Sequence, residues 1–506
     1  MFRWHGMTAR GFCLIGLSFV IYAYLALTIP QIRNSTYCCE QSSLAAAVSH
    51  RLYGTTIGAL NRNVLYYFLT HIDEPLETVL DGVQQVTPGV LFKTTRDGNG
   101  VGYPLVATIA IAAFGLHAWA LTLLMLALMF VSSIAFLQRF SGLGFVVLLY
   151  FCALTVMLFT PLVWNHSYLA NFTVGGVRYY SLAGVLPTLH ILLELVDRKQ
   201  QKPAVCNYLL LGLQTAILML VVLVRGSAIP AFAMIALVAM AVAWRQRCWR
   251  HWWRGQAWSN KVSVISAVSA VLLLTIAFLM PAYLNGGRFG TVIWQRVTES
   301  IGVHPRWPFS GAQEMFPCRE WISQGLESGA SDINGACMWF SYLTDHYLRL
   351  GAVTDQNFGT MYETALREAF FAIAARYPKE VMETFLYYKP GLIIPALLQD
   401  LDIRLNHYSP QAVCLLFLSL ALALIYFNSE AVQAQDFRPI MGVTTIAALF
   451  TLPAYIAAWA APHTVGDLLF YCLFLALLGG AYALRILRVG EVEKQHSLHR
   501  PTLGQG

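Results

Sequence analysis

The sequence predicts an all-α polytopic membrane protein with about ten transmembrane helices. Of its 506 residues, 57% are hydrophobic and only 12% are charged, whereas soluble domains are about 25% charged. Many apolar runs approach the roughly 20 residues that a helix needs to cross a hydrocarbon core about 30 Å thick. Two polar connections, residues 30–116 and 285–410, separate these runs. We therefore expect residues 1–506 to form a single membrane-embedded domain with two long outside loops.

The apolar runs define the predicted spans in order. They are residues 11–29, 117–137, 142–163, 177–196, 206–224, 228–244, 262–284, 411–427, 440–460 and 464–484. The first run leads into "IPQIRNSTYCCEQ", which lacks the small-residue pattern of a signal-peptide cleavage site. Residues 102–116 could form an eleventh span. Residues 105–116 are too short to cross at 1.5 Å of rise per residue, so we expect an outside, membrane-edge or re-entrant helix instead.

Lysine and arginine indicate the orientation of the spans. With the N-terminus inside, sixteen of these residues lie on the inner side, and only Arg178 and Arg225 lie in short outside connections. The strongest inner segment is "WRQRCWRHWWRGQAWSNK". Both termini are therefore expected in the cytoplasm and both long loops in the periplasm, with the chain in the inner (cytoplasmic) membrane. Topology accounts for most of the formal charge of +7, so this charge does not indicate a nucleic-acid partner.

The second long loop contains an amphipathic pattern. In "TMYETALREAFFAIAARYPKEVMETFLYY", the apolar residues Leu366, Phe370, Ile373 and Tyr377 recur at helical spacing, and Pro378 interrupts the run. This pattern predicts a helix that lies on the bilayer or on the bundle of spans.

The cysteines leave two interpretations open. Cys318 and Cys337 lie in the same outside loop and could form a disulfide if that compartment is oxidising. All ten cysteines could equally be small buried hydrophobic residues. The histidines show no metal-ligand spacing, and His304 is expected to have a surface or packing role. No P-loop, zinc motif or dinucleotide fingerprint is present, so the sequence indicates no metal and no cofactor.

Three carboxylates in the first long loop are candidates for a general base. Glu40 directly precedes an alanine-rich helical stretch that ends at Gly54, and Asp73 and Asp97 follow later in the loop. A carboxylate at a membrane surface can take a proton from a hydroxyl acceptor. It can equally cap a helix or shape a turn, and Asp97 precedes Gly98 in a turn-forming run.

The order of these features resembles the GT-C superfamily of integral-membrane glycosyltransferases, in particular the bacterial branch related to protein mannosyltransferases and aminoarabinose transferases. Members of that branch typically carry an acidic residue soon after the first span, a proline segment, and a Phe-Gly before the next span. Here the corresponding positions are Glu40, Pro104-Leu105 and Phe114-Gly115. The family's Asp-Glu pair is Cys39-Glu40 in this chain, and the first proline of its pair is Tyr103.

The resemblance implies transfer of a sugar from a polyprenyl-phosphate donor to an envelope glycan, lipid or protein on the outside face. Such a reaction needs a base for the acceptor hydroxyl, for which Glu40 is the first choice and Asp97 the second. It also needs cations at the outer bilayer edge for the leaving phosphate. The candidates for donor binding are Arg178, Arg225, Lys389 and Tyr179.

Two other functions remain open. An O-antigen polymerase or ligase also has about ten to twelve spans and a large late loop, but lacks a long carboxylate-bearing loop directly after the first span. A lipid or polysaccharide transporter is disfavoured, because the sequence shows neither paired halves nor a charge in the middle of a span.

Overall fold

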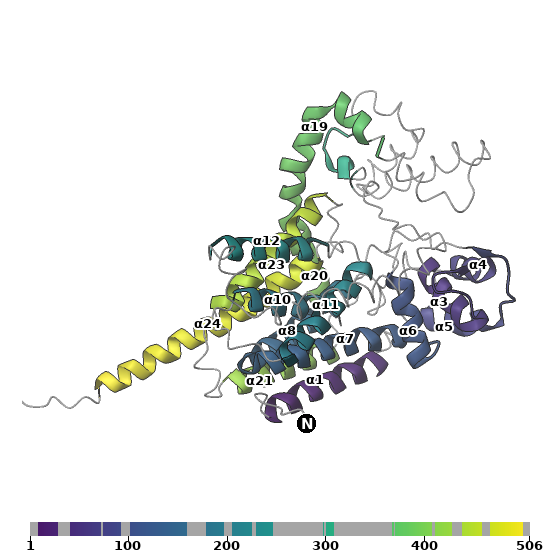
Figure 1. Ribbon diagram of the computed structural model, residues 1–506. Helices are drawn as coiled ribbons and strands as arrows, with labels where there is room; N and C mark the ends of the chain where they lie inside the picture. The colour runs from purple at the N-terminus through teal and green to yellow at the C-terminus, as the bar shows by residue number, and fades with distance from the viewer. Residues whose placement is uncertain are drawn as a thin grey trace, which may run out of the picture.

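The computed structural model describes residues 9–28, 41–71, 74–92, 102–158, 179–196, 205–224, 229–245, 297, 300–307, 367–368, 370–406, 410–427, 438–457 and 466–498. In Figure 1 these residues form a bundle of apolar helices with a smaller helical unit at one end. The long helices of the bundle are α1 (Ala9–Thr28), α7 (Ala118–Arg139), α8 (Gly144–Leu158), α10 (Val185–Val196), α11 (Val205–Val224), α12 (Ile229–Arg245), α21 (Pro410–Phe427), α23 (Arg438–Ala457) and α24 (Gly466–Leu498).

These helices make the chain a helical membrane protein. Among the described residues, three stretches are long and apolar enough to cross a membrane by length and composition: Ala118–Arg139, Asn207–Val224 and Asp467–Leu487. Every predicted span except 262–284, which lies outside the described residues, coincides with one of the helices named above. The total number of spans and the side of the membrane on which each loop lies stay predictions.

Two boundaries differ from the prediction. The span predicted over 464–484 continues as α24 to Leu498, because residues 485–498 contain no proline to end a helix. The span predicted over 177–196 is divided at Gly184 into α9 (Tyr180–Ala183) and α10. A side chain at Gly184 would lie 3.2 Å from a methyl carbon of Val221, so the glycine allows α11 to pack closely here.

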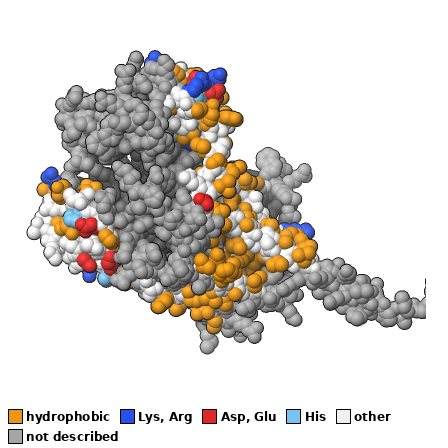
Figure 2. Space-filling view, turned by 180° about the vertical axis from the view of Figure 1, so that it is seen from behind, with side chains coloured by type: hydrophobic (Ala, Val, Ile, Leu, Met, Phe, Trp, Pro, Cys, Tyr) orange, Lys and Arg blue, Asp and Glu red, His pale blue; other side chains and the backbone are white. Residues whose placement is uncertain are grey.

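The bundle packs through its apolar faces. α1 lies against α7, with the rings of Phe19 and Phe130 stacked at 4.5 Å, and α8 packs against α21 and α24. Figure 2 shows apolar side chains over much of the described surface of the bundle, with charged side chains mainly toward its ends. Such a surface suits contact with lipid, where charges at the centre of a span are costly.

The described part of the first long loop folds into a unit that we call the first-loop unit, residues 41–71 and 74–92. Its elements are α3 (Gln41–Tyr53), α4 (Arg62–Thr70), α5 (Leu76–Gly82), the 3-10 helix η1 (Val83–Gln85), and the antiparallel two-residue strands β1 (Leu60–Asn61) and β2 (Leu91–Phe92). The buried Asn61 caps α4 and also exchanges hydrogen bonds of 3.1 Å with the backbone of Gly89. The alanine-rich α3 is followed by Gly54 at φ +64°, as the sequence predicts.

Helix α6 (Gly102–Phe114) joins the first-loop unit to the bundle. It has 13 residues and rises about 20 Å, which is less than the thickness of a hydrocarbon core. One side contacts α3, where Ala45, Ala46 and Ala47 are fully buried, and the other contacts α7 and α11. Gly115, at φ +88°, ends the helix before α7 begins. This length agrees with a membrane-edge helix. We call the end of the bundle next to α6 the outer end, after the predicted orientation; the side of the membrane on which it lies stays a prediction.

The described part of the second long loop is centred on one broken helix. Residues 370–376 are helical, and the backbone N–H of Tyr377 donates to the Ile373 carbonyl at 2.7 Å. Pro378 then starts α19 (Pro378–Glu383). A π-helix, η7 (Thr384–Tyr388), and then α20 (Lys389–Asn406) follow. Ile373 is fully buried, in agreement with the predicted apolar face, whereas Leu366 lies outside the described residues. The short helix η4 (Ser300–Val303) packs on η7.

Candidate functional site

Most of the predicted site residues lie outside the described part of the chain. These are the carboxylates Glu40, Asp73 and Asp97, the arginines Arg178 and Arg225, and the cysteines Cys318 and Cys337. Tyr179 and Lys389 are described. We therefore infer the arrangement of the site from described residues that lie close in sequence to the undescribed site residues.

Several of these bordering residues meet at the outer end of the bundle. Gly102, the first residue of α6, packs so closely on α11 that a Cβ there would lie 2.6 Å from the Leu223 carbonyl carbon and 2.7 Å from the Val224 nitrogen. The next residue, Tyr103, is fully buried, with its ring 6.2 Å from that of Tyr180 in an edge-to-face contact. The chain that follows the Asp97 loop thus meets the residues next to Arg225 and Arg178.

Tyr179 is part of this packing. It immediately precedes α9 and is only 5% exposed. Nearby, the hydroxyl of Tyr150 on α8 donates to the Leu182 carbonyl at 2.9 Å and fixes the position of α9. The Tyr179 ring is therefore packed at the outer end, and its role in donor binding stays a prediction.

A mostly apolar cleft with a carboxylate in its lining lies beside this junction, and the sequence did not predict it. We call it the outer cleft. It is bounded by α9, α10, α11, α12, α23 and α24, and Asp467 in the first turn of α24 accepts a hydrogen bond from the hydroxyl of Ser181. The two residues are 286 positions apart in the sequence. The signal in the sequence was an acidic residue at the predicted outer end of the last span.

Lys389 occupies a second polar centre, in the second long loop. Its side chain is fully buried, and its Nζ donates to Ser300 Oγ at 2.6 Å and lies 5.4 Å from the ring centroid of Phe385. It is the first residue of α20, directly after the π-helix η7. π-helical turns are rare in proteins, and those that occur are often found at functional sites. The described contacts tie Lys389 to η4 and do not bring it to Tyr179.

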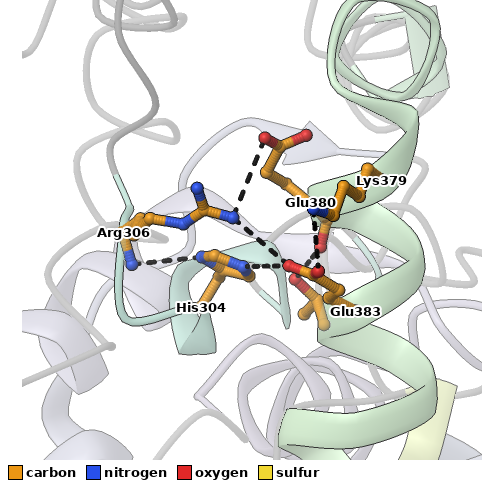
Figure 3. A network of polar contacts seen from close by, with 6 residues as sticks. His304, Arg306, Lys379, Glu380 and Glu383 are labelled. Carbon is orange, nitrogen blue, oxygen red and sulfur yellow. Dashed lines mark hydrogen bonds and ion pairs between the residues drawn. The ribbon is translucent and has the colours of Figure 1, made fainter.

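A charged network next to Lys389 holds residues 300–307 on α19 (Figure 3). The backbone N–H of Arg306 donates to His304 Nδ1 at 3.1 Å, so Nε2 carries the ring hydrogen and points to Glu383 Oε2 at 3.4 Å. The Arg306 guanidinium lies 3.3 Å from the same oxygen, and Lys379 Nζ lies 3.8 Å from the other. The hydrogen bond from His304 lowers the pKa of Glu383 below its ordinary value, and the neighbouring cations add to this effect. His304 is therefore part of a polar network that holds residues 300–307 against α19.

Another polar cluster lies toward the inner end of the bundle. Gln214 on α11 accepts from the Ser132 hydroxyl at 2.7 Å and donates to the Ser132 carbonyl at 2.8 Å, next to the fully buried His190 of α10. Farther along, Arg139 at the end of α7 forms an ion pair with Glu194 of α10. This cluster joins α7, α10 and α11. Its polar side chains bond to one another because lipid offers them no polar partner.

The described residues contain no group of three or more potential metal ligands. Comparisons with known proteins found no matching family model and no matching curated protein. Among solved structures, the chain is similar to the crystal structure of ArnT from Cupriavidus metallidurans bound to undecaprenyl phosphate. The TM-score is 0.36 and the identity 14%, over 94% of this chain and 78% of that chain. A TM-score at this level does not establish a shared fold, so the likeness carries no argument about this protein.

Proposed function

We propose that this protein is a membrane glycosyltransferase. In this proposal it transfers a sugar from a polyprenyl-phosphate donor to an envelope glycan, lipid or protein at the outer end of its spans. The observation that carries the proposal is the close packing of Gly102 on Val224 and of Tyr103 on Tyr180. These contacts bring together three parts of the chain that border Asp97, Arg225 and Arg178.

The proposed reaction assigns a chemical task to each group. The acceptor hydroxyl oxygen attacks the anomeric carbon, the bond from that carbon to the phosphate oxygen breaks, and the phosphate leaves with the bonding electrons. Glu40, with Asp97 and Asp73 as successive alternatives, takes the hydroxyl proton. Arg178 and Arg225 bind the phosphate as its charge develops, through charge-assisted hydrogen bonds. Lys389 is a third candidate for this role.

The folded first-loop unit supports a transferase over a polymerase or ligase. The described residues of the first-loop unit form a set of helices that pack on α6 and α7, and such a folded loop is expected to be absent from polymerases and ligases. A transporter receives no support from the described residues. Glu194, a charged residue of α10, forms an ion pair with Arg139 at the inner end of the spans and does not lie free at their middle.

The proposal is tested by transfer from lipid-linked sugars in reconstituted membranes. Glu40→Gln should abolish transfer while leaving insertion and thermal stability unchanged. Asp81→Asn is the matched control, because Asp81 is an exposed carboxylate of the same loop. If Glu40→Gln retains full activity, the base is sought at Asp97 and then at Asp73. If no lipid-linked sugar supports transfer by the wild-type protein, the proposed function is wrong.

The phosphate role has its own test. Arg225→Ala should raise the KM for the lipid donor more than the KM for the acceptor, because the arginine contacts only the donor phosphate. Arg62→Ala is the control, since Arg62 is an exposed arginine of the first-loop unit. An unchanged donor KM would remove Arg225 from the proposed site, and the same comparison applies to Arg178.

A further inference from the structure

A groove separates α21 from α24 on the side of the bundle where both helices pack on α8. These two helices make few contacts with each other. The gap between them encloses about 250 Å³, and its described lining contains no polar side chain. We call it the inner groove. Its lining includes Phe145 and Leu149 of α8, Leu420 and Leu424 of α21, and Gly480 and Leu484 of α24.

The wall that α24 contributes is an open helix face. Ala476, Gly480 and Leu484 follow one another at intervals of four residues, so they lie on one face of the helix, and all three are exposed. Small residues in a span usually let a second helix approach closely. Here no described heavy atom lies within 4 Å of a Cβ added at Gly480. Within the described part of the chain, this face is therefore lined by small residues but is not covered by a helix.

The inner groove has the depth of one leaflet of a bilayer. Between Asp467 and Arg485, α24 contains no charged residue, and the groove begins at Ala476, in the half nearer Arg485. From Ala476 to Leu484 the helix rises about 12 Å. One leaflet contributes about 15 Å, which is half of a hydrocarbon core about 30 Å thick. The groove therefore lies among the lipid chains of the leaflet opposite the outer end of the bundle.

The size of the inner groove decides what fits into it. One turn of a helix, about 10 Å across and 5.4 Å long, occupies about 400 Å³, so the groove is too small to bury a span of another protein. An apolar cavity of about 150 Å³ holds a benzene molecule, and the inner groove is larger, at about 250 Å³. A hydrocarbon chain needs no polar partner and gains dispersion contacts from every side chain that it touches. A flexible chain of this kind matches both the volume and the lining.

We propose that the inner groove binds one acyl chain of a phospholipid from the leaflet opposite the outer end. The chain enters between Leu424 and Leu484, which line the groove and are 50% and 45% exposed. It fills the gap between α21 and α24 and so joins two helices that otherwise meet mainly through α8. The site does not depend on the proposed transfer reaction, because the donor phosphate of that reaction is placed at the outer end.

Retention of phospholipid by the full-length protein tests the proposal. The protein is reconstituted with phosphatidylethanolamine and phosphatidylglycerol, exchanged into a mild detergent and weighed by native mass spectrometry. Gly480→Leu fills the groove and should lower the amount of retained phospholipid by about fivefold or more. Ala476→Leu fills the same groove from an exposed position and should give the same loss. Gly479→Leu is the matched control, because Gly479 lies outside the lining and also has no described atom within 4 Å of an added Cβ.

The position of the chain is measured with a phospholipid that carries a photoreactive diazirine in one acyl chain. In the wild-type protein it should label peptides that contain residues 420–424 and 476–484, and this labelling should fall in Gly480→Leu but not in Gly479→Leu. Phe417, which is 67% exposed on α21 and lies outside the groove lining, reports ordinary contact with lipid. Its labelling should be the same in all three proteins.

Four results would overturn the proposal. Equal retention by Gly480→Leu, Ala476→Leu and Gly479→Leu would show that the groove holds no phospholipid. Equal changes in labelling at Phe417 and in the groove would show ordinary lipid contact without a site. Displacement of the labelled phospholipid by excess undecaprenyl phosphate would assign the groove to an isoprenoid chain instead. A wild-type dimer that dissociates on Gly480→Leu would make the groove a contact between two copies of the protein.

Discussion

Removing the carboxylate of Glu77 should release the first-loop unit from the start of α7. Glu77 lies in α5, and its two oxygens accept from the Ala118 backbone N–H and meet His117 Nδ1, each at 2.7 Å. Glu77 is 19% exposed and His117 is 43% exposed, so the amide contact is the better shielded of the two. The contact joins residues that are 41 positions apart, and it satisfies a backbone donor at a helix N-terminus.

The size of the effect follows from these two contacts. A hydrogen bond from an amide to a carboxylate contributes about 1.5–3 kcal/mol, and a half-exposed ion pair contributes less than about 1 kcal/mol. Glu77→Ala should therefore destabilise the docked state by about 2–3 kcal/mol. This corresponds to about 30- to 150-fold faster hydrogen exchange at the Ala118 amide. Glu77→Gln keeps a neutral acceptor and should show a smaller change.

Hydrogen exchange with mass spectrometry on peptides that span residues 114–122 measures the effect. Asp81→Ala removes an exposed carboxylate from the same helix and should leave the exchange unchanged. If Glu77→Ala and Asp81→Ala give the same exchange at the start of α7, the contact does not hold the first-loop unit. The reasoning about how this unit is positioned would then be refuted.

Three further predictions concern the bundle and the second loop. Gly102→Ala should separate α6 from α11 and cost about 1–3 kcal/mol in thermal stability. Gly212→Ala, with nothing within 4 Å of its added carbon, should not destabilise the protein. Equal melting temperatures of the two variants would refute this prediction. Gln214→Leu should cost about 1 kcal/mol in a detergent denaturation series, and an unchanged midpoint would mean that the contact with Ser132 is neutral. Because the folded-state pKa of Glu383 is lowered, its stabilisation is present above its ordinary pKa of 4.5 and is lost as the pH falls through the folded value. Glu383→Gln should therefore weaken the acid sensitivity of protection in residues 300–307, and an identical pH profile would exclude this ion pair as its cause.

The sequence predicted the elements of this fold better than their contacts. The alanine-rich α3, the interruption at Pro378 and the short α6 follow from local chemistry: helix propensity, the missing proline N–H, and segment length. The partners of Asp467 and Gln214 lie 286 and 82 residues away. Apolar spans in lipid carry little information about which faces meet, because a lipid-facing side and a packed side can have the same composition.

The candidate site shows the same limit. Sequence reasoning identified charges that oppose the topological bias, and the described residues next to Arg178 and Arg225 do border one junction. It did not single out Asp467, because an acidic residue in the first turn of a helix is common and favoured by the helix dipole. The contact with Ser181 and the surrounding cleft distinguish this residue from an ordinary first-turn charge.

The links between α7, α10 and α11 have a consequence for how the protein is made. Ser132 and Arg139 enter the membrane with α7, but Glu194 is synthesised 55 residues after Arg139, and Gln214 is synthesised 82 residues after Ser132. Until those residues emerge from the ribosome, α7 carries polar groups without their final partners. We therefore expect the early spans to stay next to the insertion machinery until α11 has been translated. A nascent chain truncated after α8 should accordingly stay associated with that machinery, and one truncated after α11 should be released into the bilayer.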